Sequence, residues 1–342
     1  MRRACAHGRC EEALNPLAGR LADGLADRLA DGLAARPVIV LDGALATELE
    51  RRGVDLRDPL WSAKCLIESP DTIRAVHLDY FIAGADVATT ATYQATFEGF
   101  ERRGIDREGA ERLMRDAVAI ATAARDEFWA EPSNRPSRSR PLVAASIGPY
   151  GAMLADGSEY RGGYAVSDAE LARFHRPRLE ILASTGADLI ACETLPCLRE
   201  ALVLARLLQE FPAVSAWISF SCRDGSSNSQ GEPVSGCAAA LRGHDQIAAL
   251  GVNCTAPAYV SEILDRMGAQ ADKPLIAYPN SGEAYDACEK RWTGHAGCLR
   301  ICDQVGDWYR AGARLIGGCC RSTPEDIRDI AAQVRSLTRS MV

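Results

Sequence analysis

The chain has 342 residues, of which 47% are hydrophobic and 25% charged, and its formal net charge is −7. These proportions are typical of a globular protein with a sizeable core, and the negative charge argues against a general nucleic-acid-binding protein, which would carry a basic surface. No apolar run approaches the roughly 20 residues that a membrane-spanning helix needs, and none of the three lysines lies in a phosphate-binding G-x-x-x-x-G-K-[ST] motif.

The cysteines indicate the redox environment. There are 13 of them, an odd number that cannot pair completely within one chain, and their spacing is not that of a small disulfide scaffold. Acidic residues Glu11 and Glu12 stand where a secretory signal would have its apolar core. We therefore expect a cytoplasmic protein with free thiols, most of them small buried side chains.

Residues 1–36 are predicted to form an N-terminal extension that is partly disordered or helical. The stretch LADGLADRLADGLA (Leu21–Ala34) repeats leucine every four residues, which keeps the leucines near one face of a helix. Its glycines weaken that helix. We expect the extension to pack on the domain, and the alternative is a helix that binds a partner.

Residues 37–338 alternate between short segments with strand character and longer helical segments. The predicted strands are Pro37–Gly43, Ala85–Tyr93, Pro141–Gly151, Ala187–Pro196, Ser215–Cys222, Ala248–Pro257, Pro274–Gly282 and Ala313–Cys320. The clearest helices are predicted at Asp71–Gly84, with an aspartate cap, at Arg107–Ala130, and at Ser167–Gly186, with a Ser-x-x-Glu capping box.

Eight strands that alternate with helices predict a (β/α)8 TIM barrel in a single domain. An open doubly wound sheet is the rival fold, but it usually has fewer strands, and no G-x-G-x-x-G motif follows the first strand here. The polar segment Glu131–Pro141 lies between a helix and a strand, so we interpret it as a loop. Barrel enzymes carry their chemistry at the C-terminal ends of the strands, and those ends provide the candidate site residues.

Three cysteines lie at such ends. Cys254 follows the sixth predicted strand, and Cys319 and Cys320 end the eighth, after two glycines that we expect to let both side chains turn to one point. Three thiolates suit Zn2+ and leave its fourth position for a substrate. Such an ion activates water poorly but can keep a substrate thiol ionised, which favours alkyl transfer to sulfur. Core packing or a redox pair are the alternatives.

Two carboxylates end other strands, Asp42 the first and Glu193 the fourth. They could anchor the ammonium group of an amino-acid substrate, while backbone N–H groups near Gly43, at a helix start, could bind its carboxylate. Helix capping and turn formation are the alternatives for both side chains.

Several features carry weaker signals. The aromatic rings of Tyr93, Trp61, Tyr160, Tyr164 and Tyr278 could face a cationic substrate, or simply pack. The loop at 155–164 could be a lid. Cys298 and Cys302 are expected to line a buried helix face, because no matching fourth ligand is evident.

The motifs at these positions resemble the homocysteine S-methyltransferase family. The matching segments are LDGALATELERRG, LWSAK, RAVHLDYFIAGAD, TATYQAT, SIGPYGA, ADGSEYRGGY, ACETLP, GVNC, YPNSGE and ARLIGGCCRSTPEDI. The resemblance runs from about Asn15 to about Ile330, and the pairing of GVNC with GGCCR is its most specific part. It is greatest to the bacterial and plant enzymes that use S-methylmethionine, and more distant to betaine-using enzymes.

The resemblance implies Zn2+ bound by Cys254, Cys319 and Cys320. It also implies contacts from Asp42 and Glu193 to the homocysteine amino group, with the Gly43 region near its carboxylate. Further residues that it implies in the site are Asn253, as a support for Cys254, and Tyr93 and Trp61 in the pocket wall. The implied reaction moves a methyl group from a sulfonium to homocysteine, giving methionine. S-methylmethionine is the first choice of donor and S-adenosylmethionine the second.

Other functions stay open at this point. Within the same chemistry, the acceptor could be selenocysteine or the donor a betaine. A glycoside hydrolase could use Glu193 and Glu283, but it leaves the cysteines unexplained. The five histidines form no H-x-H motif for an amidohydrolase, and Lys273 starts a strand instead of ending one, against a Schiff-base aldolase. A non-catalytic zinc-binding protein is the alternative of another class. We expect a monomer with small-molecule substrates and no nucleic-acid or membrane partner.

Overall fold

The computed structural model describes residues 38–56, 58, 60–286, 291–293 and 300–340. Eight parallel strands form one sheet, and each overlaps a segment that the sequence predicts as a strand; the sixth begins one residue before its predicted segment. They are β1 (Ile39–Val40), β2 (Val87–Thr89), β3 (Leu142–Ile147), β4 (Leu189–Leu195), β5 (Ala216–Phe220), β6 (Ile247–Asn253), β7 (Leu275–Tyr278) and β10 (Ala313–Ile316).

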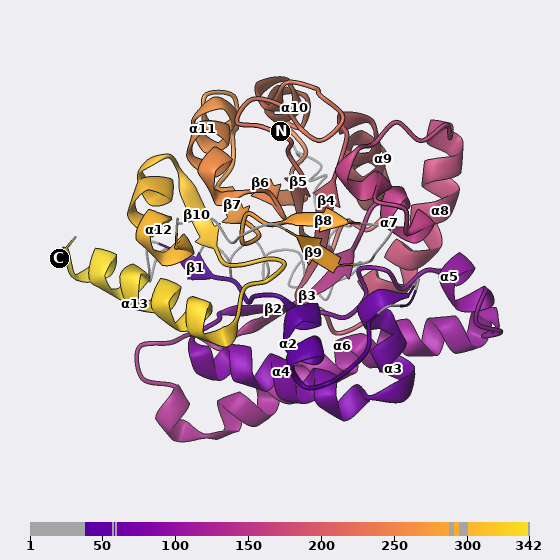
Figure 1. The fold of residues 1–342 in the computed structure, drawn as a ribbon, viewed down its shortest axis with the longest axis horizontal. Helices are drawn as coiled ribbons and strands as arrows, with labels where there is room; N and C mark the ends of the chain where they lie inside the picture. The colour runs from indigo at the N-terminus through magenta and orange to yellow at the C-terminus, as the bar shows by residue number, and fades with distance from the viewer. Residues whose placement is uncertain (1–37, 57, 59, 287–290, 294–299, 341–342) are drawn as a thin grey trace, which may run out of the picture.

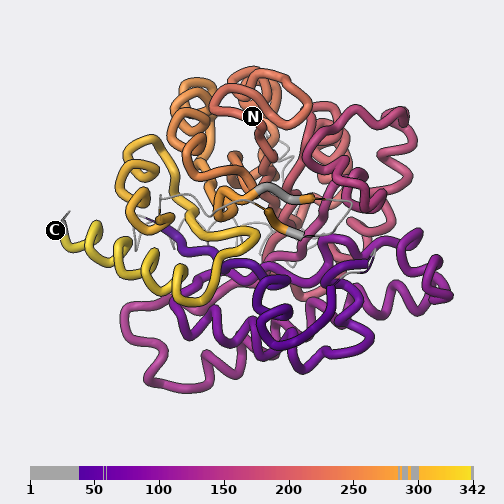
Figure 2. Tube along the Cα trace, viewed as in Figure 1, coloured from indigo at the N-terminus to yellow at the C-terminus, as the bar shows by residue number. Residues whose placement is uncertain are grey.

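The sheet closes on itself. Its strand order is β1-β10-β7-β6-β5-β4-β3-β2, and a parallel bridge between Leu41 and Val87 joins the two outer strands. The Asp42 N–H donates to the Val87 carbonyl at 3.0 Å, and the Asp86 N–H donates to the Val40 carbonyl at 2.7 Å. The predicted single-domain (β/α)8 barrel is therefore confirmed. Figure 1 shows the strands at the centre with the helices around them, and Figure 2 shows the indigo start of the described chain running beside the yellow C-terminal part, where β1 pairs with β10.

The helices follow the strands in chain order. They are α2 (Leu45–Arg51), α3 (Cys65–Glu68), α4 (Pro70–Ala83), α5 (Phe97–Glu101), α6 (Arg107–Ala130), α7 (Tyr150–Leu154), α8 (Asp168–Ala183), α9 (Leu198–Leu208), α10 (Val234–Ala240), α11 (Pro257–Gly268), α12 (Ile301–Arg310) and α13 (Pro324–Ser340). Short 3-10 turns lie at η1 (Trp61–Lys64), η2 (Pro132–Asn134) and η3 (Ser158–Tyr160), and a hairpin pairs β8 (Ala284–Asp286) with β9 (Arg291–Thr293). No helix in these ranges has the length and apolar character that a membrane crossing requires.

Helix termini show where local sequence rules hold. The predicted capping box of α8 is present, since the Ser167 side chain accepts from the Glu170 N–H and the Glu170 carboxylate accepts from the Ser167 N–H. The predicted aspartate cap of α4 is wrong: the helix begins at Pro70, with Ser69 before it, so Asp71 lies inside the first turn. Proline suits that first position because its missing N–H would have no helical partner there.

The apolar side chains divide between the two faces of the barrel wall. One cluster fills the barrel, with members such as Leu41, Val87, Trp217, Ile276 and Leu315. A larger cluster packs the outside of the strands against the helices. Because side chains alternate along a strand, polar residues at inward positions near the strand ends face the mouth of the barrel. The expectation for residues 1–36 lies outside the described residues.

Candidate active site

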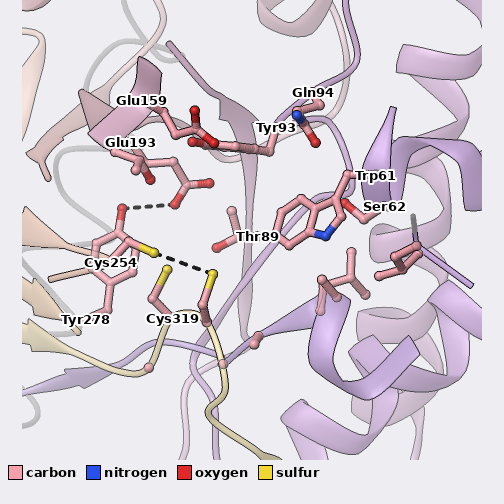
Figure 3. Close-up of a pocket in the computed structure, with 18 of the residues that line it drawn as sticks. Trp61, Ser62, Thr89, Tyr93, Gln94, Glu159, Glu193, Cys254, Tyr278 and Cys319 are labelled. Carbon is pink, nitrogen blue, oxygen red and sulfur yellow. Dashed lines mark hydrogen bonds between the residues drawn. The ribbon is translucent and has the colours of Figure 1, made fainter. Parts of the chain in front are cut away.

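A cavity of about 130 Å³ lies at the C-terminal mouth of the barrel. It is lined by three cysteines, by acidic side chains and by aromatic rings, which Figure 3 shows converging on one space. Eight of the nine site residues that the sequence predicts line this cavity: Asp42, Gly43, Trp61, Tyr93, Glu193, Cys254, Cys319 and Cys320. The ninth, Asn253, is buried beside it.

The three sulfurs form a compact group. Those of Cys254, Cys319 and Cys320 all lie within 4.8 Å of one another, and the Cys254 and Cys320 sulfurs are 3.4 Å apart. A tetrahedral zinc site with Zn–S bonds of about 2.3 Å places its sulfurs roughly 3.8 Å apart. The group therefore has the composition and the spacing of a three-thiolate metal site.

Backbone contacts between neighbouring strands bring the sulfurs together. The Cys254 N–H donates to the Tyr278 carbonyl at 3.1 Å, and the Cys319 N–H donates to the Pro279 carbonyl at 2.8 Å. Cys254 has a φ of 47°, a left-handed conformation that is uncommon without glycine. Strain of this kind often marks a functional position.

The two glycines before Cys319 are required because there is no space for a side chain at either position. Neither has a positive φ. A Cβ on Gly317 would come within 2.9 Å of the Asp42 carbonyl oxygen, and one on Gly318 within 2.2 Å of the Ser322 Oγ. The expectation that they add backbone freedom is thus wrong: Gly317 is needed where the last strand passes close to the first, and Gly318 where the chain folds back to Ser322.

Hydrogen bonds surround the sulfurs. The Tyr160 hydroxyl lies 3.2 Å from the Cys254 sulfur. Contacts with the thiols of Cys319 and Cys320 lower the pKa of Cys254 well below its usual value, and the same contacts with Cys254 raise the pKa of Cys320. The three thiols therefore titrate as a coupled group, in which ionisation of one makes ionisation of the others harder.

The side-chain amide of Asn253 links residues of three strands beside the sulfur group. Its Oδ1 accepts from the Thr194 N–H at 2.7 Å and from the Ser219 hydroxyl at 2.8 Å. Its Nδ2 donates to the Thr194 hydroxyl at 2.8 Å and lies 3.8 Å from the sulfur of Cys319. The amide thus contacts the sulfur of Cys319, whereas the sequence-based expectation pairs it with Cys254.

Asp42 and Glu193 are buried and hydrogen-bonded. Asp42 accepts from the Thr89 N–H at 2.8 Å and from the Thr89 hydroxyl at 3.1 Å. Glu193 accepts from the hydroxyls of Ser146 and Tyr278. Burial raises the pKa of Asp42 to about 8 and that of Glu193 to about 7. A ligand cation between them would offset the cost of burying their charges.

Replacing Asp42 with asparagine is expected to stabilise the substrate-free protein near pH 8 by roughly 1–3 kcal/mol. The native carboxyl keeps its proton up to a pKa of about 8, whereas the unfolded one loses it near about 3.9. The native state therefore binds more protons in that window, and its free energy of unfolding falls as the pH rises through it. Urea unfolding at about pH 5 and about pH 8 checks this, and an equal effect at both values would contradict it.

Gly43 lies where the chain turns from β1 into α2. A Cβ there would come within 2.8 Å of the Ser322 Oγ and 2.9 Å of the Tyr80 hydroxyl, so glycine is required by close packing. The next N–H, that of Ala44, donates to the Ser322 Oγ at 3.2 Å. Gly43 itself borders the cavity.

The aromatic residues divide into two groups. Trp61 and Tyr93 meet edge to face, with ring centroids 6.1 Å apart, and form one wall of the cavity. Tyr278 acts through its hydroxyl, which bonds the Trp217 indole N–H as well as Glu193. Tyr164 is not among the residues that line the cavity; its hydroxyl donates to the buried Glu200.

The loop at 155–164 supplies three cavity residues, Ala155, Glu159 and Tyr160. Of these, the sequence reasoning names only Tyr160. Glu159 does not come directly after a strand, and it is not part of a periodic pattern. The only sequence feature that could have marked it as a site residue is its place in a Gly- and Tyr-rich loop. Cys302 is buried in α12, as expected, and Cys298 lies outside the described residues.

Comparisons with known proteins agree with this geometry. The model of the homocysteine S-methyltransferase family matches residues 39–334. The homocysteine S-methyltransferase YbgG of Bacillus subtilis (strain 168) is 56% identical over 301 residues, which cover 88% of this chain and 96% of the relative. The homocysteine S-methyltransferase of Escherichia coli (strain K12) is 50% identical over 297 residues, covering 86% and 95%. The crystal structure of the E. coli homocysteine methyltransferase MmuM, in its metallated form, matches with a TM-score of 0.81 and 46% identity over 89% of this chain and 99% of that one.

Proposed function

The chain belongs to the homocysteine S-methyltransferase family, and within that activity we propose zinc as the metal and S-methylmethionine as the methyl donor. The observation that carries the proposal is the group of three sulfurs at the edge of a cavity that also holds buried carboxylates. We also propose a reducing, cytoplasmic setting, which is supported by nine unpaired cysteines in the described ranges.

The donor set supports zinc. Cys254, Cys319 and Cys320 would hold the ion, because three thiolates at this spacing match its ligand preferences. When bound, the ion would supply the positive charge that keeps the thiol of homocysteine ionised near neutral pH. The MmuM structure in metallated form is consistent with this assignment.

Asp42 and Glu193 would bind the homocysteine ammonium group. Their own hydrogen bonds to Thr89, Ser146 and Tyr278 fix the two carboxylates in place before substrate arrives, and this preorganisation lowers the entropic cost of binding. An amino acid held at that end has its sulfur directed to the cysteine group. Orientation of this kind is the main source of rate in a reaction that joins two bound substrates.

The methyl transfer itself needs little general acid or base catalysis from the protein. The homocysteine thiolate forms the new S–CH3 bond while the bond from the methyl group to the donor sulfur breaks. The leaving group is then a neutral thioether, so no general acid is required. The wall formed by Trp61 and Tyr93 excludes water and offers π-faces to the cationic donor. With S-methylmethionine, both products are methionine.

The glycoside hydrolase alternative is not supported. Glu283 accepts from the Ser281 hydroxyl at 2.7 Å and from the Arg321 guanidinium at 3.0 Å, and it is not among the residues that line the cavity. Glu283 therefore does not supply the second carboxylate that this alternative assigns to it beside Glu193.

A donor comparison tests the proposal. Purified protein with zinc and homocysteine is expected to form methionine fastest from S-methylmethionine, with a kcat/KM at least about tenfold above S-adenosylmethionine, betaine and methyltetrahydrofolate. Product formation is followed with a labelled methyl group. Faster transfer from betaine or the folate would overturn the donor assignment, and faster methylation of selenocysteine would change the acceptor.

A further inference from the structure

A buried carboxylate with one unpartnered oxygen lies in the wall of the cavity. Glu159 is 7% exposed, and its Oε2 has no hydrogen-bond partner among the described residues. Asp42 and Glu193, by contrast, are both hydrogen-bonded. Burying a carboxylate without compensation is costly, and such groups in native structures usually await a ligand or an ion.

The fold holds Glu159 in this position. The Ser221 hydroxyl donates to the Glu159 carbonyl at 2.9 Å, and the neighbouring Tyr160 reaches the Cys254 sulfur. A Cβ on Gly151 would lie 2.7 Å from the Glu159 nitrogen, so glycine lets the two segments approach closely. These contacts therefore fix the backbone of η3. The fixed backbone in turn holds the Glu159 side chain in the wall of the cavity.

Glu159 lies on the aromatic side of the cavity. Figure 3 shows its carboxylate beside Tyr93, with Trp61 farther along the same wall. Asp42 and Glu193 come instead from the ends of β1 and β4. The cavity lining holds four acidic side chains, including Asp58, and no arginine or lysine within the part of the chain that the structure describes. Its charge therefore favours more than one cationic group.

We propose that Glu159 binds the α-ammonium group of an amino-acid sulfonium donor and thereby selects donors that carry one. This inference rests on the proposed function, in which two amino acids bind together and bring two ammonium groups. Asp42 and Glu193 are assigned to one of these groups, and Glu159 is the remaining fully buried carboxylate in the lining.

The ammonium is a better partner for Glu159 than the sulfonium. The sulfonium loses its charge during transfer, so a carboxylate placed on it would stabilise the ground state more than the transition state. The ammonium keeps its charge throughout, so a carboxylate placed on it strengthens binding of the ground state and of the transition state alike. Loss of the Glu159 charge is therefore expected to raise KM and to leave kcat unchanged.

The test is Glu159→Gln, which keeps the shape of the side chain and removes its charge. The KM for S-methylmethionine is expected to rise about 30-fold or more, as for one partner of a buried charge pair, while kcat stays within about threefold and the KM for homocysteine within about twofold. Dimethylsulfoniopropionate keeps the dimethylsulfonium and carboxylate groups but lacks the ammonium. Its kcat/KM, measured with a labelled methyl group, is expected to change less than about threefold.

Equal losses with both donors, an unchanged KM for S-methylmethionine, or an equal rise in the KM for homocysteine would overturn the proposal. Asp156→Asn is the matched control, because this side chain lies in the same loop and is 54% exposed. Thermal melting of both variants checks their folding. If wild-type protein forms no methionine at all, the proposed function fails. Calorimetric titration of S-methylmethionine into wild type and Glu159→Gln then tests Glu159 separately, and equal affinities would reject it.

Discussion

Replacing Cys320 with serine is expected to lower both zinc affinity and the rate of methyl transfer to homocysteine by more than about 100-fold, the upper end of what loss of a supporting residue costs. The Cys320 sulfur lies 3.4 Å from that of Cys254, and a serine hydroxyl does not ionise to replace it. Metal analysis of the purified variant and an assay with S-methylmethionine give the two readouts. Loss of both together is expected, because the metal keeps the acceptor thiol ionised.

Cys302→Ser is the matched control for this change. Cys302 is also buried, but it lies on α12 and does not line the cavity. Its replacement is expected to leave zinc content and kcat unchanged, whatever it does to the melting temperature. If Cys320→Ser kept full zinc and full activity, the three cysteines would be packing residues and the metal site would lie elsewhere.

Replacing Glu193 with glutamine is expected to raise the KM for homocysteine about 30-fold or more, because removing one partner of a buried charge pair costs about 2–5 kcal/mol. The amide keeps the size of the side chain and can still accept from Ser146. Zinc content is expected to stay the same, since the sulfurs are untouched. The ammonium does not change charge in the reaction, so kcat should fall much less than KM rises.

Steady-state kinetics with homocysteine as the varied substrate measure this effect. Glu262→Gln is a suitable control, because Glu262 is exposed and pairs with Arg266 on α11. The opposite pattern, an unchanged KM for homocysteine with a raised KM for the donor, would assign Glu193 to the donor and reverse its role with that of Glu159.

The barrel can be predicted from the sequence because its signals are local. Each strand is a short apolar segment bounded by turn residues, and α6 has the predicted bounds, Arg107–Ala130. The cysteine group follows from the fold, because parallel strands present their C-terminal ends at one mouth. Cys192 and Glu193 are neighbours on β4, and side chains alternate along a strand. The thiol is therefore buried between the barrel wall and the helices, while the carboxylate faces the cavity.

The remaining features depend on contacts between distant segments. Glu159 reaches the cavity only because Ser221 and Gly151 hold its loop. The amide of Asn253 lies by Cys319 because Thr194, with a φ of 60°, and Ser219 orient it. Gly317 serves close packing between the last and first strands, and Gly318 leaves room for the Ser322 side chain. None of these relations has a period or a spacing that a single sequence reveals.

Titration of zinc into chelator-treated protein, with methionine formation from S-methylmethionine and homocysteine as the readout, tests the central claim most directly. Activity is expected to be near zero in the stripped protein, to rise linearly with added zinc, and to level off at about one ion per chain, as for a single tight site. Full activity before any zinc is added, or a rise that Cys320→Ser reproduces unchanged, would contradict a three-cysteine metal site as the basis of the reaction.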